Sequence, residues 1–226
     1  MEPHVRKNRN EERKRQTRHR LLSAAARVFI RKGYHKPKTS DIAAEAGVGQ
    51  GTFYRNFRDK RDVFETLLEG FISELLNEFS EMSTRPPTST EEYREASIIA
   101  LRRMVLLVQR NRKLALLFIR EAPAVDDHIA QVMAGMYDRF ADLAKSYLDH
   151  AIQSGFTRPC RSDIIAQSIV GMGLRMVELW LDGRFSETPA DELITMLVDF
   201  AFNGLSPLSR EACSSKGMLE EQEGEP

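Results

Sequence analysis

One short segment of the sequence combines polar side chains with phenylalanines at a spacing suited to nucleic-acid recognition. On a helix, Phe53 and Phe57 fall on one side, which leaves the polar residues Gln50, Thr52 and Arg55 on the outer side. The amide of Gln50 and the guanidinium of Arg55 can pair with the edges of adenine and guanine, and each good bidentate contact supplies about 1–3 kcal/mol of discrimination. The segment therefore predicts base contacts, with a solvated surface arginine as the alternative for Arg55.

Residues beside this segment have chemistry that suits phosphate groups. The hydroxyls of Thr39 and Tyr54 and the ammonium of Lys60 can fix the position of a duplex without carrying sequence information. Gly49 and Gly51 lack a side chain, so the backbone there can approach a ligand closely. The complete predicted set of DNA contacts is Lys38, Thr39, Gly49, Gln50, Gly51, Thr52, Tyr54, Arg55 and Lys60.

Charge is divided unevenly along a chain whose formal net charge is zero. The first 62 residues carry 17 Lys or Arg against 7 Asp or Glu, and the remaining residues carry 16 against 26. Such a split suggests that the basic end meets a polyanion, and nucleic acid is the natural candidate. The extension over residues 1–16 could reach a minor groove or neighbouring phosphates through Arg6, Lys7, Arg9, Arg13, Lys14 and Arg15. A solvated charged tail is the alternative for this extension.

Glycines and prolines divide the sequence into segments whose apolar residues repeat about every 3.6 positions, which predicts an all-α fold. A first helix is expected over residues 17–32, with an apolar stripe of Leu22, Ala25, Ala26 and Phe29, and two short helices follow over residues 40–46 and 50–57. The turn between the short helices contains Gly47 and Gly49, as in a helix-turn-helix. The small core that these helices are expected to share consists of Leu22, Val28, Phe29, Ile42, Ala46, Val48, Phe53 and Phe57.

Beyond residue 60 the sequence predicts a longer helical region that ends in two unusually apolar helices. A helix beginning at Lys60 has an apolar stripe over more than four turns and would connect the basic end to this region. The last two helices, over residues 161–181 and 189–203, are apolar on more than one face, so one face needs a partner. A two-fold dimer through a four-helix bundle would supply that partner, and a pair buried inside a monomer is the alternative. The residues predicted at the dimer interface are Ile169, Val170, Gly173, Val177, Trp180, Leu197 and Phe200.

A signature resembling that of the TetR family of transcriptional regulators occupies residues 41–57, DIAAEAGVGQGTFYRNF, and continues with Lys60, Val63 and Phe64. Positions that usually touch DNA in this family are matched by Gln50, Gly51, Tyr54 and Lys60. Departures from the family's common residues occur at Lys38, Thr39, Gly49 and Asn56, so the operator sequence is not predictable. The resemblance implies an N-terminal three-helix helix-turn-helix DNA-binding domain, a C-terminal helical ligand-binding and dimerisation domain, and about nine helices.

The same resemblance implies a homodimeric repressor that binds a palindromic operator in double-stranded DNA and leaves it when a small-molecule effector binds. Such an effector would act by changing the separation of the two recognition helices, which must be about 34–36 Å for successive turns of the major groove. The candidate pocket residues, each of which could instead be an ordinary core residue, are Met104, Phe118, Met133, Met136, Tyr137, Phe140, Met172 and Met176. Because thioethers fill irregular apolar volumes, we expect an apolar or amphipathic ligand.

The sequence contains no pattern that indicates a metal, a cofactor or an enzyme's active site. Cys160 and Cys213 are too far apart for a CxxC pair, and no HExxH, P-loop or GxSxG sequence occurs. No stretch approaches the roughly 20 uninterrupted apolar residues of a membrane span, and the most apolar segment, residues 164–181, is expected to be a buried helix. We therefore expect a cytoplasmic protein that is not an enzyme. Two other classes stay open: a helical interaction module whose basic end binds acidic protein or a membrane surface, and an enzyme with an unrecognised site.

The sequence also predicts four segments with different roles. A basic extension (1–16) precedes a helix-turn-helix DNA-binding domain (17–62), and an effector-binding and dimerisation domain (63–205) follows. The tail over residues 206–226 is rich in Ser, Gly and Glu and is expected to be disordered.

Overall fold

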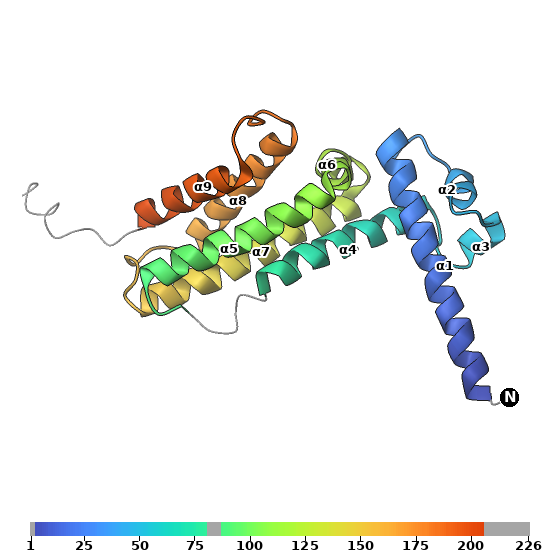
Figure 1. Ribbon diagram of the computed structural model, residues 1–226, viewed down its shortest axis with the longest axis horizontal. Coiled ribbons are helices and arrows are strands. Elements are labelled where there is room, and N and C mark those ends of the chain that lie inside the picture. Colours follow the sequence, from blue (N-terminus) through green and yellow to red (C-terminus); the bar gives the residue numbers. More distant parts are fainter. Residues whose placement is uncertain (1–2, 81–86, 206–226) are drawn as a thin grey trace, which may run out of the picture. The chain divides into compact units, whose positions relative to one another are not determined.

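The computed structural model describes residues 3–80 and 87–205, and in these ranges the chain forms nine α-helices and one 3₁₀ turn without a β-strand (Figure 1). The predicted all-α fold is therefore confirmed, whereas the tail over residues 206–226 lies outside the described residues. The elements are α1 (Pro3–Lys32), α2 (Thr39–Glu45), α3 (Gln50–Tyr54), α4 (Lys60–Ser80), α5 (Thr90–Arg110), α6 (Arg112–Glu121), η2 (Ala122–Ala124), α7 (Asp127–Gln153), α8 (Ser162–Leu181) and α9 (Ala190–Leu205).

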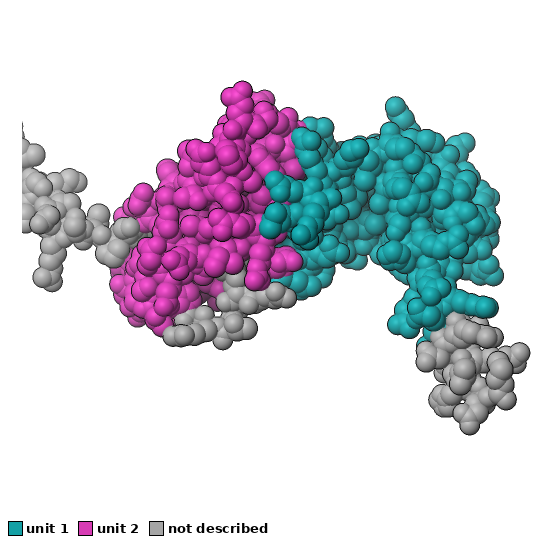
Figure 2. Space-filling model, in the orientation of Figure 1, with its two compact units in different colours: residues 1–77, 106–136 teal, residues 78–105, 137–226 magenta. Residues whose placement is uncertain are grey.

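The helices group into two compact units, which Figure 2 colours separately. Unit 1 consists of Met1–Asn77 and Leu106–Met136, and unit 2 consists of Glu78–Val105 and Tyr137–Pro226. Unit 1 therefore holds α1 to α3, α6 and most of α4, whereas unit 2 holds α8, α9 and most of α5 and α7. This division by contacts differs from the boundary expected at residue 62 between a DNA-binding and an effector-binding domain. That boundary concerns function and stays a prediction.

The core of unit 1 joins α1 and α4 to α6. The ring of Phe64 packs edge-on against Phe29 and Tyr34, at centroid distances of 5.6 and 4.8 Å. Phe118 of α6 completes this aromatic cluster at 5.4 Å from Phe64, and each such pair contributes about 0.5–1.5 kcal/mol beyond the burial of its surface. At the end of α6, a carboxylate oxygen of Glu121 accepts the backbone N–H of Tyr34 at 2.6 Å. The segment around α6 thus supports the N-terminal helices directly.

Two expectations about the first helix are wrong in detail. α1 begins at Pro3, so residues 3–16 form the first turns of α1 and do not precede the helix. The buried stripe consists of Leu21, Ala24, Ala25, Val28 and Phe29, whereas Leu22 and Ala26, like Val48 after α2, are only half-buried. The sequence has apolar residues at both 21 and 22 and an unbroken run of alanines at 24–26. Two neighbouring faces of α1 are therefore equally apolar, and packing against α2 to α4 decides which of them is buried.

Ion pairs and a small apolar cluster hold α5 against α9 in unit 2. The guanidinium of Arg94 donates to Asp199 at 2.7 Å, and that of Arg102 donates to Asp191 at 2.7 Å. Between these helices lies a cluster of Val105, Ile194 and Val198, with Ile98, Leu101, Trp180, Ala190 and Phe202 packed against it. Trp180 of α8, which the sequence places at a dimer interface, is therefore engaged in part by its own chain.

The apolar surfaces of α8 and α9 are largely uncovered within the chain. In α8 only Ala166 and Leu181 are buried. Ile164, Met196 and Phe200 expose 53%, 59% and 70% of their surface. The expectation of a buried helix over the most apolar segment, and the alternative of a pair buried inside a monomer, are therefore wrong for the single chain. By length and composition alone, α8 is the one helix in the described ranges that is long and apolar enough to cross a membrane.

Candidate nucleic-acid interface

Contacts within its own sequence fix the two ends of α2. At its start, a carboxylate oxygen of Asp41 accepts the backbone N–H of Lys38 at 2.8 Å, and this bond is the main reason that the pKa of Asp41 is lowered. After its end, Gly47 has a φ of 64°, a left-handed conformation in which a side chain would be strained. The chain is thereby turned from α2 toward α3.

Arginines of α1 hold the carboxyl end of α2. Glu45 accepts hydrogen bonds from Arg27 at 2.8 Å and Arg31 at 2.5 Å. The bond from Arg31 is the largest cause that lowers the pKa of Glu45 from 4.5 to about 2. Arg20 donates to the carbonyl oxygen of Ala46 at 2.8 Å, where a cation also complements the partial negative charge of a helix end. The position of the turn is thus set by α1.

α3 is anchored by two phenylalanines that face inward. Phe53 and Phe57 expose 0% and 2% of their surface, and their ring centroids lie 6.0 Å apart. The helix spans only Gln50–Tyr54, so the prediction of a helix to residue 57 is wrong. The reason is the side-chain amide of Asn56, which donates to the carbonyl of Thr52 at 2.8 Å and takes the acceptor that a continuing helix would use. The two phenylalanines are nevertheless buried as predicted.

The outer side of α3 is open. Gln50, Gly51 and Arg55 are exposed, and Tyr54 exposes 56% of its surface. A Cβ atom built at Gly51, or at Gly49 before the helix, would meet no atom within 4 Å. Packing within the protein therefore does not require glycine at either position, and the missing side chains leave room for another molecule.

Four of the predicted contact residues hold one another in place. The hydroxyls of Thr39 and Tyr54 lie 3.1 Å apart and join the start of α2 to the end of α3. The guanidinium of Arg55 donates to the hydroxyl of Thr52 at 2.9 Å. Each pair keeps further donors and acceptors for a ligand, because a hydroxyl has two lone pairs and a guanidinium has five N–H groups. The structure thus brings these side chains together on one surface.

Lys60 is positioned differently from the other predicted contacts. Its ammonium donates to the carbonyl oxygen of His35 at 3.0 Å and lies 4.4 Å from the centre of the Tyr34 ring. Partial burial lowers the pKa of Lys60. These bonds fasten the loop after α1 to the start of α4, which is a structural role beside the predicted phosphate contact. Lys38, by contrast, is exposed.

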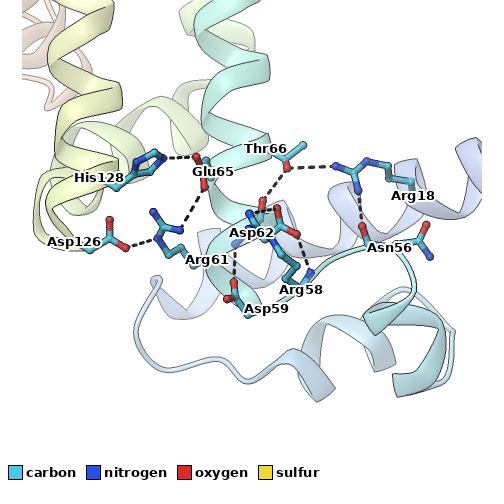
Figure 3. Close-up of polar contacts among 10 residues, drawn as sticks. All are labelled: Arg18, Asn56, Arg58, Asp59, Arg61, Asp62, Glu65, Thr66, Asp126 and His128. Carbon is cyan, nitrogen blue, oxygen red and sulfur yellow. Dashed lines mark hydrogen bonds and ion pairs between the residues drawn. The ribbon is translucent and has the colours of Figure 1, made fainter.

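Arg18 of α1, a residue that no predicted contact set includes, holds the loop that follows α3 (Figure 3). Its guanidinium donates to the carbonyl oxygen of Asn56 at 2.6 Å and to the hydroxyl of Thr66 at 3.5 Å. The same group lies 4.0 Å from the centre of the Phe57 ring. Arg18 thereby fixes the end of α3 relative to α1 and α4. A cation one turn before the buried Leu21 is the only signal in the sequence that could have indicated this role.

Charged residues near the start of α4 connect it to the beginning of α7 (Figure 3). Arg61 donates to a carboxylate oxygen of Asp126 at 2.5 Å. One turn later, Glu65 lies 2.6 Å from the ring nitrogen Nε2 of His128. All four residues belong to unit 1. They hold α4, the element that follows the helix-turn-helix, against the start of α7.

The predicted pocket residues are distributed over both units. Phe118, Met133, Met136 and Phe140 are buried, Met104, Met172 and Met176 are half-buried, and Tyr137 exposes 37% of its surface. Phe118 packs on Phe64 and Phe71, which gives it a structural role in unit 1. A hollow in unit 2 is lined by other, polar residues: Asp142, Lys145, Ser146, Asp149, His150 and Gln153. The pocket set therefore stays a prediction.

The predicted dimer-interface residues keep surface free in the single chain. Phe200 is exposed, and the half-buried members are Ile169, Val170, Gly173, Val177, Trp180 and Leu197. Their role at an interface likewise stays a prediction.

An all-α chain whose helix-turn-helix buries its phenylalanines and presents polar groups outward belongs to the class of DNA-binding regulators. Comparisons with known proteins agree, because residues 21–67 match the family model described as "Bacterial regulatory proteins, tetR family". Residues 21–67 thus form the DNA-binding domain of a TetR-family transcriptional regulator.

Relatives of known sequence or structure cover most of the chain. The HTH-type transcriptional activator FasR of Mycolicibacterium smegmatis is 24% identical over 197 residues, which cover 84% of either protein. A putative TetR-family regulator from Syntrophomonas wolfei is 25% identical, with a TM-score of 0.66 over 83% of this chain and 93% of that chain. The regulator FadR of Bacillus subtilis, in complex with stearoyl-CoA, shares the fold at 20% identity, with a TM-score of 0.70 over 83% and 98% of the two chains. These relatives are regulators and not enzymes, in agreement with the sequence-based expectation.

Proposed function

We propose that the protein is a repressor that binds a palindromic operator as a homodimer in the cytoplasm and leaves it when an apolar or amphipathic small molecule binds. The observation that carries the proposal is the two-sided character of α3. Phe53 and Phe57 are buried, while Gln50, Tyr54 and Arg55 are exposed, with Arg55 pointing away from the two phenylalanines. A helix of this kind can enter a major groove and meet base edges with an amide and a guanidinium.

The homodimer is supported by the uncovered apolar faces of α8 and α9. Phe200 exposes 70% and Met196 exposes 59% of its surface, and such large apolar groups rarely lie together in water without a partner. A second copy, related by a two-fold axis, would cover the same faces. A lipid environment is disfavoured because the polar residues Gln167, Arg175 and Glu178 interrupt α8. Two copies also supply the two half-sites of a palindrome.

The proposed effector class is supported by the composition of the middle helices and by one structural neighbour. Met133 and Met136 lie buried on one side of α7, and methionines adapt to ligands of irregular shape. The neighbour FadR is described in complex with stearoyl-CoA, an amphipathic molecule. The direction of control needs its own measurement, because the relative FasR is named an activator.

Selection of duplexes from a random DNA pool tests the DNA-binding part of the proposal. We expect the selected sites to be palindromes that bind about 10³-fold or more tightly than unrelated duplex. Gln50→Ala and Arg55→Ala should change the preferred bases, whereas Lys60→Ala should weaken all sites alike. Binding without sequence preference would favour an interaction module whose basic end meets any polyanion, and the proposal would then be abandoned.

The oligomeric state tests the homodimer separately. Phe200→Glu places a charge in the uncovered apolar face and should convert a dimer to a monomer in sedimentation experiments, with little change in helix content. Glu192→Gln on exposed surface of the same helix is the control, and it should stay dimeric. A wild-type protein that sediments as a monomer would remove this part of the proposal.

A reporter gene under the selected operator shows whether the protein represses or activates transcription. Release from the operator is measured with acyl-CoA esters as probes.

A further inference from the structure

α1 continues for several turns beyond the helices that it supports. From Glu11 onward, where the structure describes the side chains, the first buried residue is Leu21, and the helix itself begins at Pro3. At a rise of about 1.5 Å per residue, about 27 Å of helix lies between Pro3 and Leu21. Figure 1 shows this part of α1 running past α2 and α3. Every side chain from Glu11 to Gln16 is exposed. We refer to residues 3–16 as the overhang of α1.

The cations of the overhang are not equivalent. The guanidinium of Arg15 donates to Glu12 at 2.7 Å, and the amide of Gln16 also contacts Glu12 at 3.4 Å. For the side chains of Arg13 and Lys14, the described part of the structure contains neither an ion pair nor a hydrogen bond. Arg15 is therefore locally neutralised, whereas Arg13 and Lys14 take part in no ion pair in the described part of the structure.

Two arginines of α1 show which side of this helix faces α3. Arg18 donates to the carbonyl of Asn56 just after α3, and Arg20 donates to the carbonyl of Ala46 at the end of α2, before the turn that leads to α3. Because successive residues of a helix are rotated by about 100°, the arc from Arg18 to Arg20 through His19 is about 200°, and the arc on the opposite side is about 160°. α3 therefore lies over the sector of α1 that contains the buried Leu21, between Arg18 and Arg20.

The unpaired cations of the overhang fall in the same sector. Counting back at about 100° per residue, Arg13 and Lys14 lie between the directions of Arg18 and Arg20, whereas Arg15 lies outside. In the sequence, the same spacing continues two turns earlier with Arg6 and Lys7. The overhang thus presents a positive stripe on the side of α1 on which α3 lies.

The dimensions of a duplex bring phosphates to this stripe. A major groove is about 8.5 Å deep, and the axes of packed helices lie about 8–10 Å apart. When α3 enters the groove, the phosphates at the groove rim therefore rise to about the level of α1. A helix with its side chains is about 10–12 Å wide, so the overhang cannot enter a minor groove about 6 Å wide. A contact within the minor groove, which the sequence left open, is thereby disfavoured.

We propose that the overhang of α1 is a basic rod that binds the phosphate backbone beside each half-site through Arg13 and Lys14. This inference rests on the proposed function, since it needs α3 to lie in a major groove. The contacts add affinity that is independent of base sequence and widen the region of DNA that each subunit covers. In a homodimer, two cations per subunit amount to four phosphate contacts.

The salt dependence of operator binding tests the proposal in the full-length protein. Each phosphate contact contributes about 0.9 to the slope of log K against log salt concentration, so Arg13→Gln/Lys14→Gln should reduce the slope by about 3.6 per dimer. Affinity should fall while the preferred base sequence stays the same. Footprinting with hydroxyl radicals should lose protection just outside each half-site. The duplex used is the palindrome selected above, extended by a turn of unrelated sequence on both sides.

Arg15→Gln is the matched control, because it removes a neighbouring cation that Glu12 already neutralises. It should leave the slope within about 0.5 of the wild-type value, and Arg13→Gln alone should reduce it by about 1.8. All three positions are exposed, so unchanged circular dichroism and melting temperature verify that the variants fold. A wild-type slope in the double variant, or an equal loss in Arg15→Gln, overturns this inference alone. A wild-type protein that selects no palindrome would instead overturn the proposed function as well.

Discussion

Arg18 offers the sharpest test of how the protein positions α3. The substitution Arg18→Met keeps the aliphatic stem but removes the guanidinium from the carbonyl of Asn56 and from the Phe57 ring. A hydrogen bond from a charged group contributes about 1.5–3 kcal/mol, and a partly exposed cation–π contact contributes about 0.5–1 kcal/mol. The free energy of unfolding should therefore fall by about 2–4 kcal/mol. For a chain of this size the melting temperature should fall by roughly 4–16 °C.

Thermal unfolding followed by circular dichroism measures this effect, and binding of the selected operator shows whether α3 is displaced. Arg18→Lys keeps a charge near the Phe57 ring and should lose only about 1 kcal/mol. Arg15→Met is the control for removing an exposed cation of the same helix, and its effect should stay within about 0.5 kcal/mol. If Arg18→Met melted at the same temperature as Arg15→Met, the structural role derived for Arg18 would be refuted.

Three further predictions concern the turn before α3, the open surface of α3 and the ion pair that holds α2. Gly47→Ala forces a left-handed conformation on alanine and should cost about 1–2 kcal/mol of unfolding free energy, whereas Gly51→Ala should raise it by up to about 1 kcal/mol. Despite that gain, the Gly51→Ala variant should bind the selected operator more weakly than the wild type in a DNA titration, because its methyl group occupies the open surface of α3. Tighter binding would contradict the proposed interface. Glu45, whose pKa in the folded protein is lowered from 4.5 to about 2 chiefly by Arg31, contributes stability that is fully present above about pH 4.5 and is lost as the pH falls toward 2. The difference in melting temperature between wild type and Glu45→Gln should therefore be largest near pH 7 and shrink at pH 3, and a constant difference would count against this ion pair.

The N-terminal helices were predictable because their signals are local. Phe53 and Phe57 lie one helical turn apart between polar residues, so one side of the segment had to be buried. Gly47 stands where a short helix must end, and its φ of 64° is a conformation that few other residues adopt. The early end of α3 was missed because periodicity does not show that the side chain of Asn56 competes for a backbone acceptor.

Contacts between distant segments were not predictable from the sequence. Arg18 meets a carbonyl 38 residues later, Arg61 meets a carboxylate 65 residues later, and Glu121 meets an N–H group 87 residues earlier. A charged residue in a sequence shows that some partner is needed, but which partner it meets depends on how the helices pack. The internal bonds of Lys60 follow the same rule, since its carbonyl acceptor belongs to the loop after α1.

By itself the sequence determined the all-α class, the inward phenylalanines and outward polar groups of α3, and the positive charge of the first 62 residues. Each of these depends on residue type and on spacing within one or two helical turns, which the chain carries wherever it is placed. Only the tertiary structure decided the register of the buried stripe on α1, the partners of Arg18 and Lys60, and the exposure of Phe200. These properties depend on which helices lie against one another. The spacing of apolar residues is the same on a helix face that another helix of the chain covers and on a face that stays exposed.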